Sequence, residues 1–173
     1  MRDTDIIANL QARLGMPGGR HLYGVLGTYS ALETFAARLA QAKDANGKNF
    51  PTPLSVNGGI LDAIPDAEFR ELAEKEAKLP EPVRAHVGQA FERFLRRELA
   101  AHGLIVLWRL ELLFAYSIEM TALRTLATDE ARVILLLPGR RDGERVVMFS
   151  DADAGGYTLP TSLIANDHLW EVT

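Results

Sequence analysis

The chain has 173 residues, of which 47% are hydrophobic and 24% charged, and its 19 Lys and Arg against 23 Asp and Glu give a net charge of -4. This composition is typical of a globular protein, and the acidic balance argues against a surface that wraps nucleic acid through phosphate contacts. The absence of cysteine excludes disulfides, thiolate zinc sites, iron–sulfur clusters and cysteine nucleophiles. The length predicts one domain over residues 1–173.

Apolar residues at helical spacing predict five helices, which cover residues 3–14, 31–42, 66–78, 83–102 and 117–128. Within the single domain we expect residues 1–17 to hold the N-terminal helix and its end, and residues 66–102 to form a helical segment. Short apolar runs bounded by turn residues predict strands over residues 20–27, 54–57, 104–108, 132–137, 145–149 and 168–172.

The alternation of strands with helices predicts an α/β fold, a three-layer sandwich with a mostly parallel central sheet and helices on both faces. The runs LIVLW (104–108) and RVILLL (132–137) are apolar almost throughout, which is typical of central strands buried on both faces. The polar start MRDTD indicates no signal peptide, and the longest apolar stretch, 103–114, is too short and too charged to span a bilayer. We therefore expect a cytoplasmic protein without membrane contact.

Ligands of such sheets bind beyond the carboxyl ends of the strands, and three segments are expected there. The first follows the first strand, where backbone amides and a helix N-terminus favour an anion. Its candidate phosphate-binding residues are Gly24, Gly27, Thr28, Tyr29 and Ser30. The full phosphate-loop pattern is absent, because Tyr29 stands where a lysine should precede the hydroxyl of Ser30. The alternative is a tight turn in which Ser30 or Thr28 caps the following helix.

The second segment, 104–114, is an apolar strand followed by an acidic residue. Glu111 is the candidate catalytic residue here, as a general base for hydrolysis. The aspartate that usually holds magnesium at such a strand end is missing, because Trp108 and Arg109 follow the aliphatic run directly. The alternative is a structural ion pair between Glu111 and either Arg109 or Arg124.

The third segment, 135–143, carries Arg140 and Arg141 after the pair Pro138-Gly139. With Arg109, these arginines are candidates for contact with an anion or a partner. The alternative for 140–143 is a solvated hairpin turn. No metal site is expected, because the four histidines have no metal-ligand spacing.

These segments resemble a P-loop NTPase of the AAA+/RecA-like kind, and more narrowly the small P-loop proteins of bacterial BREX phage-defence systems of type 3. The resemblance covers about two-thirds of the chain and is carried mainly by Leu107 to Gly139, through LWRLELLF and ALRTLATDEARVILLLPG. It carries over Glu111, the Ser30 hydroxyl and the Pro138-Gly139 turn. The phosphate-loop lysine and the magnesium-holding aspartate of the family are absent, which disfavours ATP and magnesium as cofactors.

The resemblance implies an accessory protein of a phage-defence system with a degenerate P-loop NTPase fold. It would be a non-hydrolysing interaction or scaffolding subunit that assembles with larger proteins of that system, and apolar residues on the long helix allow a homo-oligomer. One alternative is a small ATPase with Glu111 as base and Arg109, Arg140 or Arg141 as the source of positive charge. Another is a nucleic-acid-binding adaptor that uses the arginines Arg96, Arg97, Arg109, Arg140 and Arg141.

Overall fold

The computed structural model describes residues 1–76, 80–149, 156–160 and 162–173. The helices in this part of the chain are α1 (Asp3–Leu14), α2 (Tyr29–Gln41), α3 (Val56–Asp62), α4 (Asp66–Lys75), α5 (Pro80–His102), α6 (Glu111–Ala115), α7 (Thr121–Leu126) and the 3-10 turn η1 (Asn166–His168). The strands are β1 (Leu22–Gly27), β2 (Leu54–Ser55), β3 (Leu104–Trp108), β4 (Arg132–Asp142), β5 (Arg145–Met148), β6 (Tyr157–Leu159) and β7 (Leu169–Glu171).

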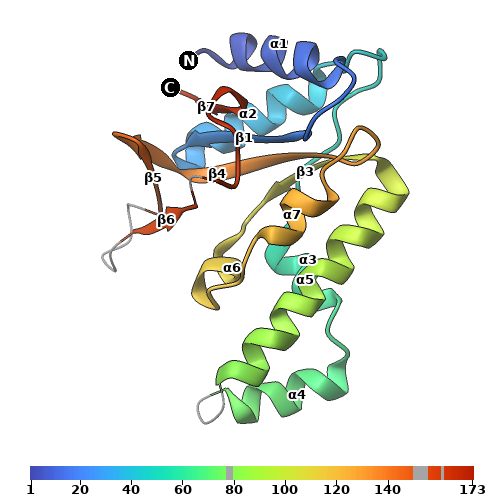
Figure 1. Ribbon diagram of the computed structural model, residues 1–173, viewed down its shortest axis with the longest axis vertical. Helices are drawn as coiled ribbons and strands as arrows, with labels where there is room; N and C mark the ends of the chain where they lie inside the picture. The colour runs from blue at the N-terminus through green and yellow to red at the C-terminus, as the bar shows by residue number, and fades with distance from the viewer. Residues whose placement is uncertain (77–79, 150–155, 161) are drawn as a thin grey trace.

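The central sheet has the strand order β2-β3-β4-β1-β7, and all of these neighbours pair in parallel (Figure 1). β5 pairs antiparallel with the far end of β4, and β6 pairs antiparallel with β5. The predicted α/β class with a mostly parallel sheet is confirmed, and the expected last strand, 168–172, is present as β7 beside β1.

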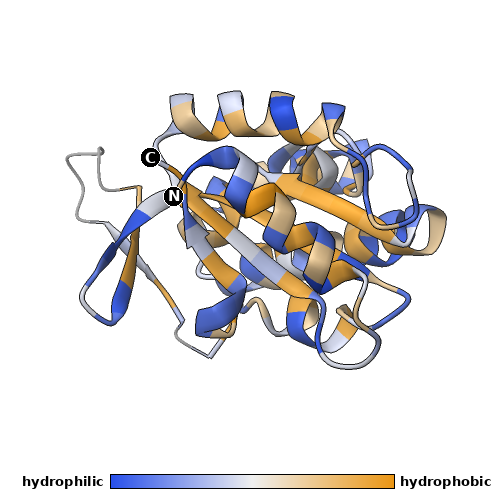
Figure 2. Cartoon of the chain, turned by 90° about the horizontal axis from the view of Figure 1, so that it is seen from above, coloured by the Kyte–Doolittle hydropathy of each residue, from blue (hydrophilic) through white to orange (hydrophobic). Residues whose placement is uncertain are grey.

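Alternate residues of the central strands pack on opposite faces of the sheet. In β1, Tyr23 and Val25 belong to the apolar cluster formed with α1 and α2, whereas Leu22 and Leu26 belong to the cluster formed with α3, α5, α6 and α7. Figure 1 shows α1 and α2 on one side of the sheet and α5, α6 and α7 on the other. Figure 2 shows the apolar residues concentrated in the central strands. Because both faces are covered, these strands are apolar at every position rather than at alternate ones.

Two predicted elements end earlier than expected. The strand predicted over 54–57 is only Leu54–Ser55, because the Ser55 hydroxyl accepts a hydrogen bond from the Gly58 amide at 3.1 Å and starts α3. The helix predicted over 117–128 is present as the shorter α7 (Thr121–Leu126), and the chain before it forms α6, which the pattern did not indicate. Ser117 lies between the two helices, and its left-handed φ of 51° cannot continue a right-handed helix.

The predicted strand end at Pro138-Gly139 is wrong. The exposed hairpin considered for 140–143 is present, but its turn is shifted to Gly143 and Glu144, because Asp142 still pairs with Arg145. β4 continues to Asp142, and the register shifts where Gly27 pairs with both Pro138 and Gly139, which makes a bulge. A bulge tolerates proline inside a sheet. A Cβ at Gly139 would lie 2.5 Å from the carbonyl oxygen of Val147, so only glycine allows β5 to approach this closely.

The loop predicted over 151–160 contains β6 in its described part, and residues 150–155 lie outside the described residues. In the described part of the chain, none of the helices combines the length and apolar character that crossing a membrane requires.

Candidate functional site

A cavity of about 670 Å³ lies at the carboxyl ends of β1 and β3, beside the bulge of β4. α2 follows β1 on one face of the sheet and α6 follows β3 on the other, so the cavity occupies the switch point where α/β sheets bind ligands. The described residues that line it are Gly27, Thr28, Tyr29, Glu111, Ala115, Pro138, Gly139, Arg140, Phe149, Tyr157, Glu171 and Val172. Five predicted site residues are therefore together: Gly27, Thr28, Tyr29, Glu111 and Arg140.

The connection between β1 and α2 is one residue long. β1 ends at Gly27, α2 begins at Tyr29, and Thr28 between them caps the helix by accepting the Ala31 amide at 3.2 Å. Thr28 thus plays the capping role considered for it, and Ser30 lies exposed in the first turn of α2. A phosphate cradle needs several successive backbone amides turned toward the ligand, and a one-residue connection cannot supply them.

The glycines of β1 are needed for close packing against the C-terminal part of the chain. Gly24 lies inside the strand, where a Cβ would come within 2.6 Å of Leu169 and 2.8 Å of Ile164. A Cβ at Gly27 would come within 2.6 Å of Val172. Both positions therefore require glycine for reasons that are independent of any phosphate ligand.

Both carboxylate oxygens of Glu111 accept hydrogen bonds. The Tyr29 hydroxyl donates to Oε1 and the Asn57 side-chain amide donates to Oε2, each at 2.7 Å. The Asn57 side-chain oxygen in turn accepts a hydrogen bond from the Leu112 backbone amide at 3.0 Å. The Asn57 backbone amide donates to the Arg109 carbonyl, also at 3.0 Å. Glu111 thus joins the starts of α2, α3 and α6. The alternative considered for Glu111, an ion pair with Arg109 or Arg124, is not formed: Arg109 pairs with Glu33, and no ion pair joins Arg124 to Glu111 among the described residues.

Arg109 lies beside the cavity rather than in its lining. Its guanidinium carbon is 5.1 Å from the Trp108 ring centroid and 5.6 Å from that of Tyr29, and its Nη2 is 3.4 Å from Glu33 Oε1. Its backbone is left-handed, with a φ of 55°. Arg109 is therefore occupied by the aromatic rings and by Glu33.

The structure separates the two neighbouring arginines of β4. Arg141 donates to the Leu169 carbonyl at 2.8 Å and to the Asn166 carbonyl at 3.4 Å, and so holds β7 against the sheet. Arg140 lines the cavity, is exposed, and forms no ion pair within the described residues. Of the three candidate arginines, Arg140 is the one available to a ligand.

An aromatic cluster forms one side of the cavity. Phe149 and Tyr157 line it, and Phe114 packs behind them, with ring centroids 5.1 to 6.1 Å apart. The Phe149 backbone is left-handed, with a φ of 56°, and its amide donates to the Pro138 carbonyl at 2.8 Å. For a bulky side chain this conformation costs about 1–3 kcal/mol and is typical of functional sites.

The sequence patterns alone do not identify Asn57, Phe149, Tyr157 or Glu171 as site residues. Asn57 belongs to a predicted strand. The other three come from short segments after β4, where β5 follows the bulge of β4, β6 pairs with β5, and β7 returns to pair with β1. The signal that was available for Asn57 is the Ser-Val-Asn-Gly sequence, in which Ser55 can cap a helix.

The charges of the cavity are unbalanced. Glu111 and Glu171 are half-buried and form no ion pair with a cation in the described part of the chain, and Arg140 opposes them from an exposed position. Within the described ranges, the Glu171 carboxylate accepts one hydrogen bond, from the Arg141 backbone amide to Oε2 at 3.4 Å. Among the described residues there is no group of three or more His, Asp or Glu side chains placed to hold a metal ion.

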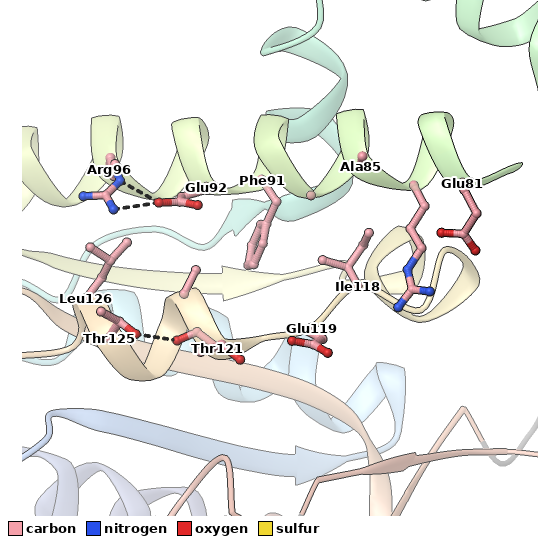
Figure 3. A pocket seen from close by; sticks show the side chains of 13 residues that line it. Glu81, Ala85, Phe91, Glu92, Arg96, Ile118, Glu119, Thr121, Thr125 and Leu126 are labelled. Atoms are coloured by element: carbon pink, nitrogen blue, oxygen red, sulfur yellow. Dashed lines mark hydrogen bonds and ion pairs between the residues drawn. The ribbon is translucent and has the colours of Figure 1, made fainter.

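A second, open groove of about 510 Å³ lies between α5 and the segment that contains α7 (Figure 3). Arg96 on its rim pairs with Glu92 at 2.6 Å, as the dashed lines in Figure 3 show. Arg97 pairs with Glu98 at 2.9 Å. These two arginines, considered for nucleic-acid binding, are therefore each neutralised by a neighbouring glutamate.

Comparisons of the chain with models of protein families, with curated proteins and with solved structures find no significant match. The site geometry and the resemblance carried by residues 107–139 are thus the basis for inferring what the protein does.

Proposed function

We propose that the chain is a non-hydrolysing accessory subunit of a bacterial phage-defence system of the BREX kind, with a degenerate P-loop NTPase-like fold. The observation that carries the loss of hydrolysis is the one-residue connection at Thr28 between β1 and α2. Phosphoryl transfer depends on positive charge and amides arranged around the phosphates. Neither the phosphate-loop lysine nor a multi-residue cradle is present after β1.

The chemistry of the cavity supports the same conclusion. The resemblance assigns the phosphate loop to the end of β1 and the acidic motif to the end of β3, and both strand ends border one cavity. This common position supports P-loop-like ancestry. The half-buried carboxylates of Glu111 and Glu171 would repel a triphosphate there. Tyr29 and Asn57 each donate a hydrogen bond to one oxygen of Glu111, which supports a structural role for this carboxylate as a link between helix starts.

The assignment to phage defence, and to larger proteins of the same system as partners, rests on the resemblance over residues 107–139. A protein that retains the α/β layers of the fold but no longer binds or hydrolyses a triphosphate can still present a surface to which other proteins bind. The nucleic-acid adaptor is less well supported, because Arg96 and Arg97 pair with glutamates, Arg109 with Glu33, and Arg141 with backbone carbonyls.

Thermal unfolding with ATP, ADP and GTP, each with and without magnesium, tests the proposal. A ligand that binds the folded state raises the midpoint in proportion to the logarithm of its concentration over its Kd. We expect no rise at millimolar nucleotide and no phosphate release. A magnesium-dependent rise that Ser30→Ala and Glu111→Gln abolish would establish the ATPase instead.

The assembly part of the proposal needs a separate experiment. The tagged chain is expressed together with the complete set of proteins of a BREX system, and the purified material is identified by mass spectrometry. We expect one or more of the larger proteins of that system to co-purify in stoichiometric amounts. Purification of the chain alone, at a concentration where it is folded, contradicts the assembly.

A further inference from the structure

We infer that the cavity at the carboxyl edge of the sheet binds a small organic cation, an ammonium group carried on a compact apolar body. This inference goes beyond the proposed function and does not depend on it. It rests on three features of the described lining: two carboxylates without a cationic partner, three aromatic rings, and a volume suited to a small molecule.

The carboxylates provide the charge that such a ligand requires. Glu111 and Glu171 come from α6 and β7 and line one cavity, each half-buried and with no ion pair to its carboxylate among the described residues. The Met1 ammonium donates to the Glu171 backbone carbonyl at 2.7 Å and not to its carboxylate. Taking a carboxylate partly out of water is unfavourable unless a positive charge or hydrogen bonds compensate. Glu111 has its two hydrogen bonds, whereas the one that the Glu171 carboxylate accepts from the described residues is long, 3.4 Å from the Arg141 backbone amide. A bound ammonium would satisfy both groups.

The aromatic rings provide the rest of the recognition. Tyr29 reaches the cavity from α2, and its ring also contacts the Arg109 guanidinium, 5.6 Å from the ring centroid. Phe149 reaches the cavity from the residue directly after β5, and Tyr157 from β6. The faces of aromatic rings attract cations, and cages of such rings with carboxylates are a common way to bind alkylated ammonium groups. The left-handed backbone of Phe149 and its hydrogen bond to Pro138 hold one of these rings in place before any ligand arrives.

The remaining charge and the size agree with this ligand class. Arg140 is exposed, so water hydrates its guanidinium. It lines the same cavity as the two carboxylates, but forms an ion pair with neither of them. A cavity of about 670 Å³ is within the range of small-molecule sites. The two carboxylates, Glu111 and Glu171, disfavour binding of an anion. The aromatic rings favour an organic cation over a hydrated inorganic cation.

Titration of the intact chain with choline and with 3,3-dimethylbutan-1-ol, its neutral isostere, tests the inference without any substitution. The two probes have the same shape and differ by one charge. We expect choline to bind about tenfold or more tightly than the alcohol, measured by calorimetry or by NMR shifts of the lining residues. Equal affinities, no binding of choline at about 10 mM, or stronger binding of phenyl phosphate than of choline would each overturn the inference.

Substitutions then locate the site. Glu171→Gln removes one charge with little change in shape, and we expect it to weaken choline binding about tenfold. Tyr157→Leu keeps an apolar side chain but loses the ring, and we expect a several-fold loss. Glu119→Gln is the matched control, because Glu119 lies in the groove beside α5 and not in this cavity. A loss of binding in the control equal to that in Glu171→Gln would contradict the assignment.

Discussion

The Tyr116 hydroxyl donates a hydrogen bond to the Glu76 carboxylate, and this bond, with burial and the negative charge nearby, raises the pKa of Tyr116 to about 12. The neutral phenol is thus favoured in the folded state. The resulting stability is fully present below the ordinary pKa near 10 and is lost as the pH rises through about 12.

Titration by absorbance near 295 nm, with Tyr116→Phe as the subtracted reference, measures this phenol directly. We expect ionisation near pH 12 in the native chain and a pKa closer to 10 in Glu76→Gln, because a neutral amide then replaces the negatively charged acceptor. Ionisation of Tyr116 at its ordinary pKa in the unsubstituted chain would contradict the hydrogen bond.

Glu111 makes a different prediction at the same scale. Glu111→Gln replaces a carboxylate that accepts a hydrogen bond on each oxygen by a neutral amide with a single acceptor oxygen, so it cannot accept from both Tyr29 and Asn57 in the same way. We expect a loss of about 1–2 kcal/mol in the free energy of unfolding, measured with urea. The exposed Glu119→Gln should change it by less than about 0.5 kcal/mol. Equal stability of the two variants would mean that the Glu111 network does not hold the three helix starts together.

Two glycines inside helices show how tertiary packing decides the effect of one methyl group. In α3, a Cβ at Gly59 would lie 2.3 Å from the buried Phe94 ring, whereas in α5 a Cβ at Gly88 would lie 3.8 Å from Ile118. We expect Gly59→Ala to destabilise the fold by about 1–3 kcal/mol through overpacking. Gly88→Ala should stabilise it by about 0.5–1 kcal/mol, because alanine favours the helix and fits. Thermal and urea unfolding of both variants measures this, and the same sign for both would be inconsistent with the packing of α3 on α5.

The elements also differ in how far local patterns predict them. α1 and β3 have the predicted bounds, 3–14 and 104–108, because their apolar spacing is continuous and their ends carry glycine or proline. α3 was not predicted, since Gly58 and Gly59 weaken its local helix preference and its stability comes from packing on α5.

At the scale of the whole molecule, the sheet needs cover on both faces. Among the described helices, α1 and α2 cover one face, together with Phe50, and Leu10 of α1 is completely buried there. We expect Leu10→Ala to cost about 2–5 kcal/mol, because it leaves a cavity against the sheet. Leu61→Ala is the control, since Leu61 is 46% exposed, and it should cost less than about 1 kcal/mol. Chemical unfolding compares them, and a small effect at Leu10 would indicate that α1 is not part of the core.

The sequence by itself determined the α/β class and the buried central strands, because strands buried on both faces have a continuous apolar pattern. It also placed Thr28, Glu111 and Arg140 shortly after these apolar runs. Only the tertiary structure decided that Glu111 bonds Tyr29 and Asn57, and that Phe149 and Tyr157 border the same cavity. The physical reason is that strand order and the β4 bulge bring together residues far apart in the chain, and no local pattern encodes which loops meet at one edge of a sheet.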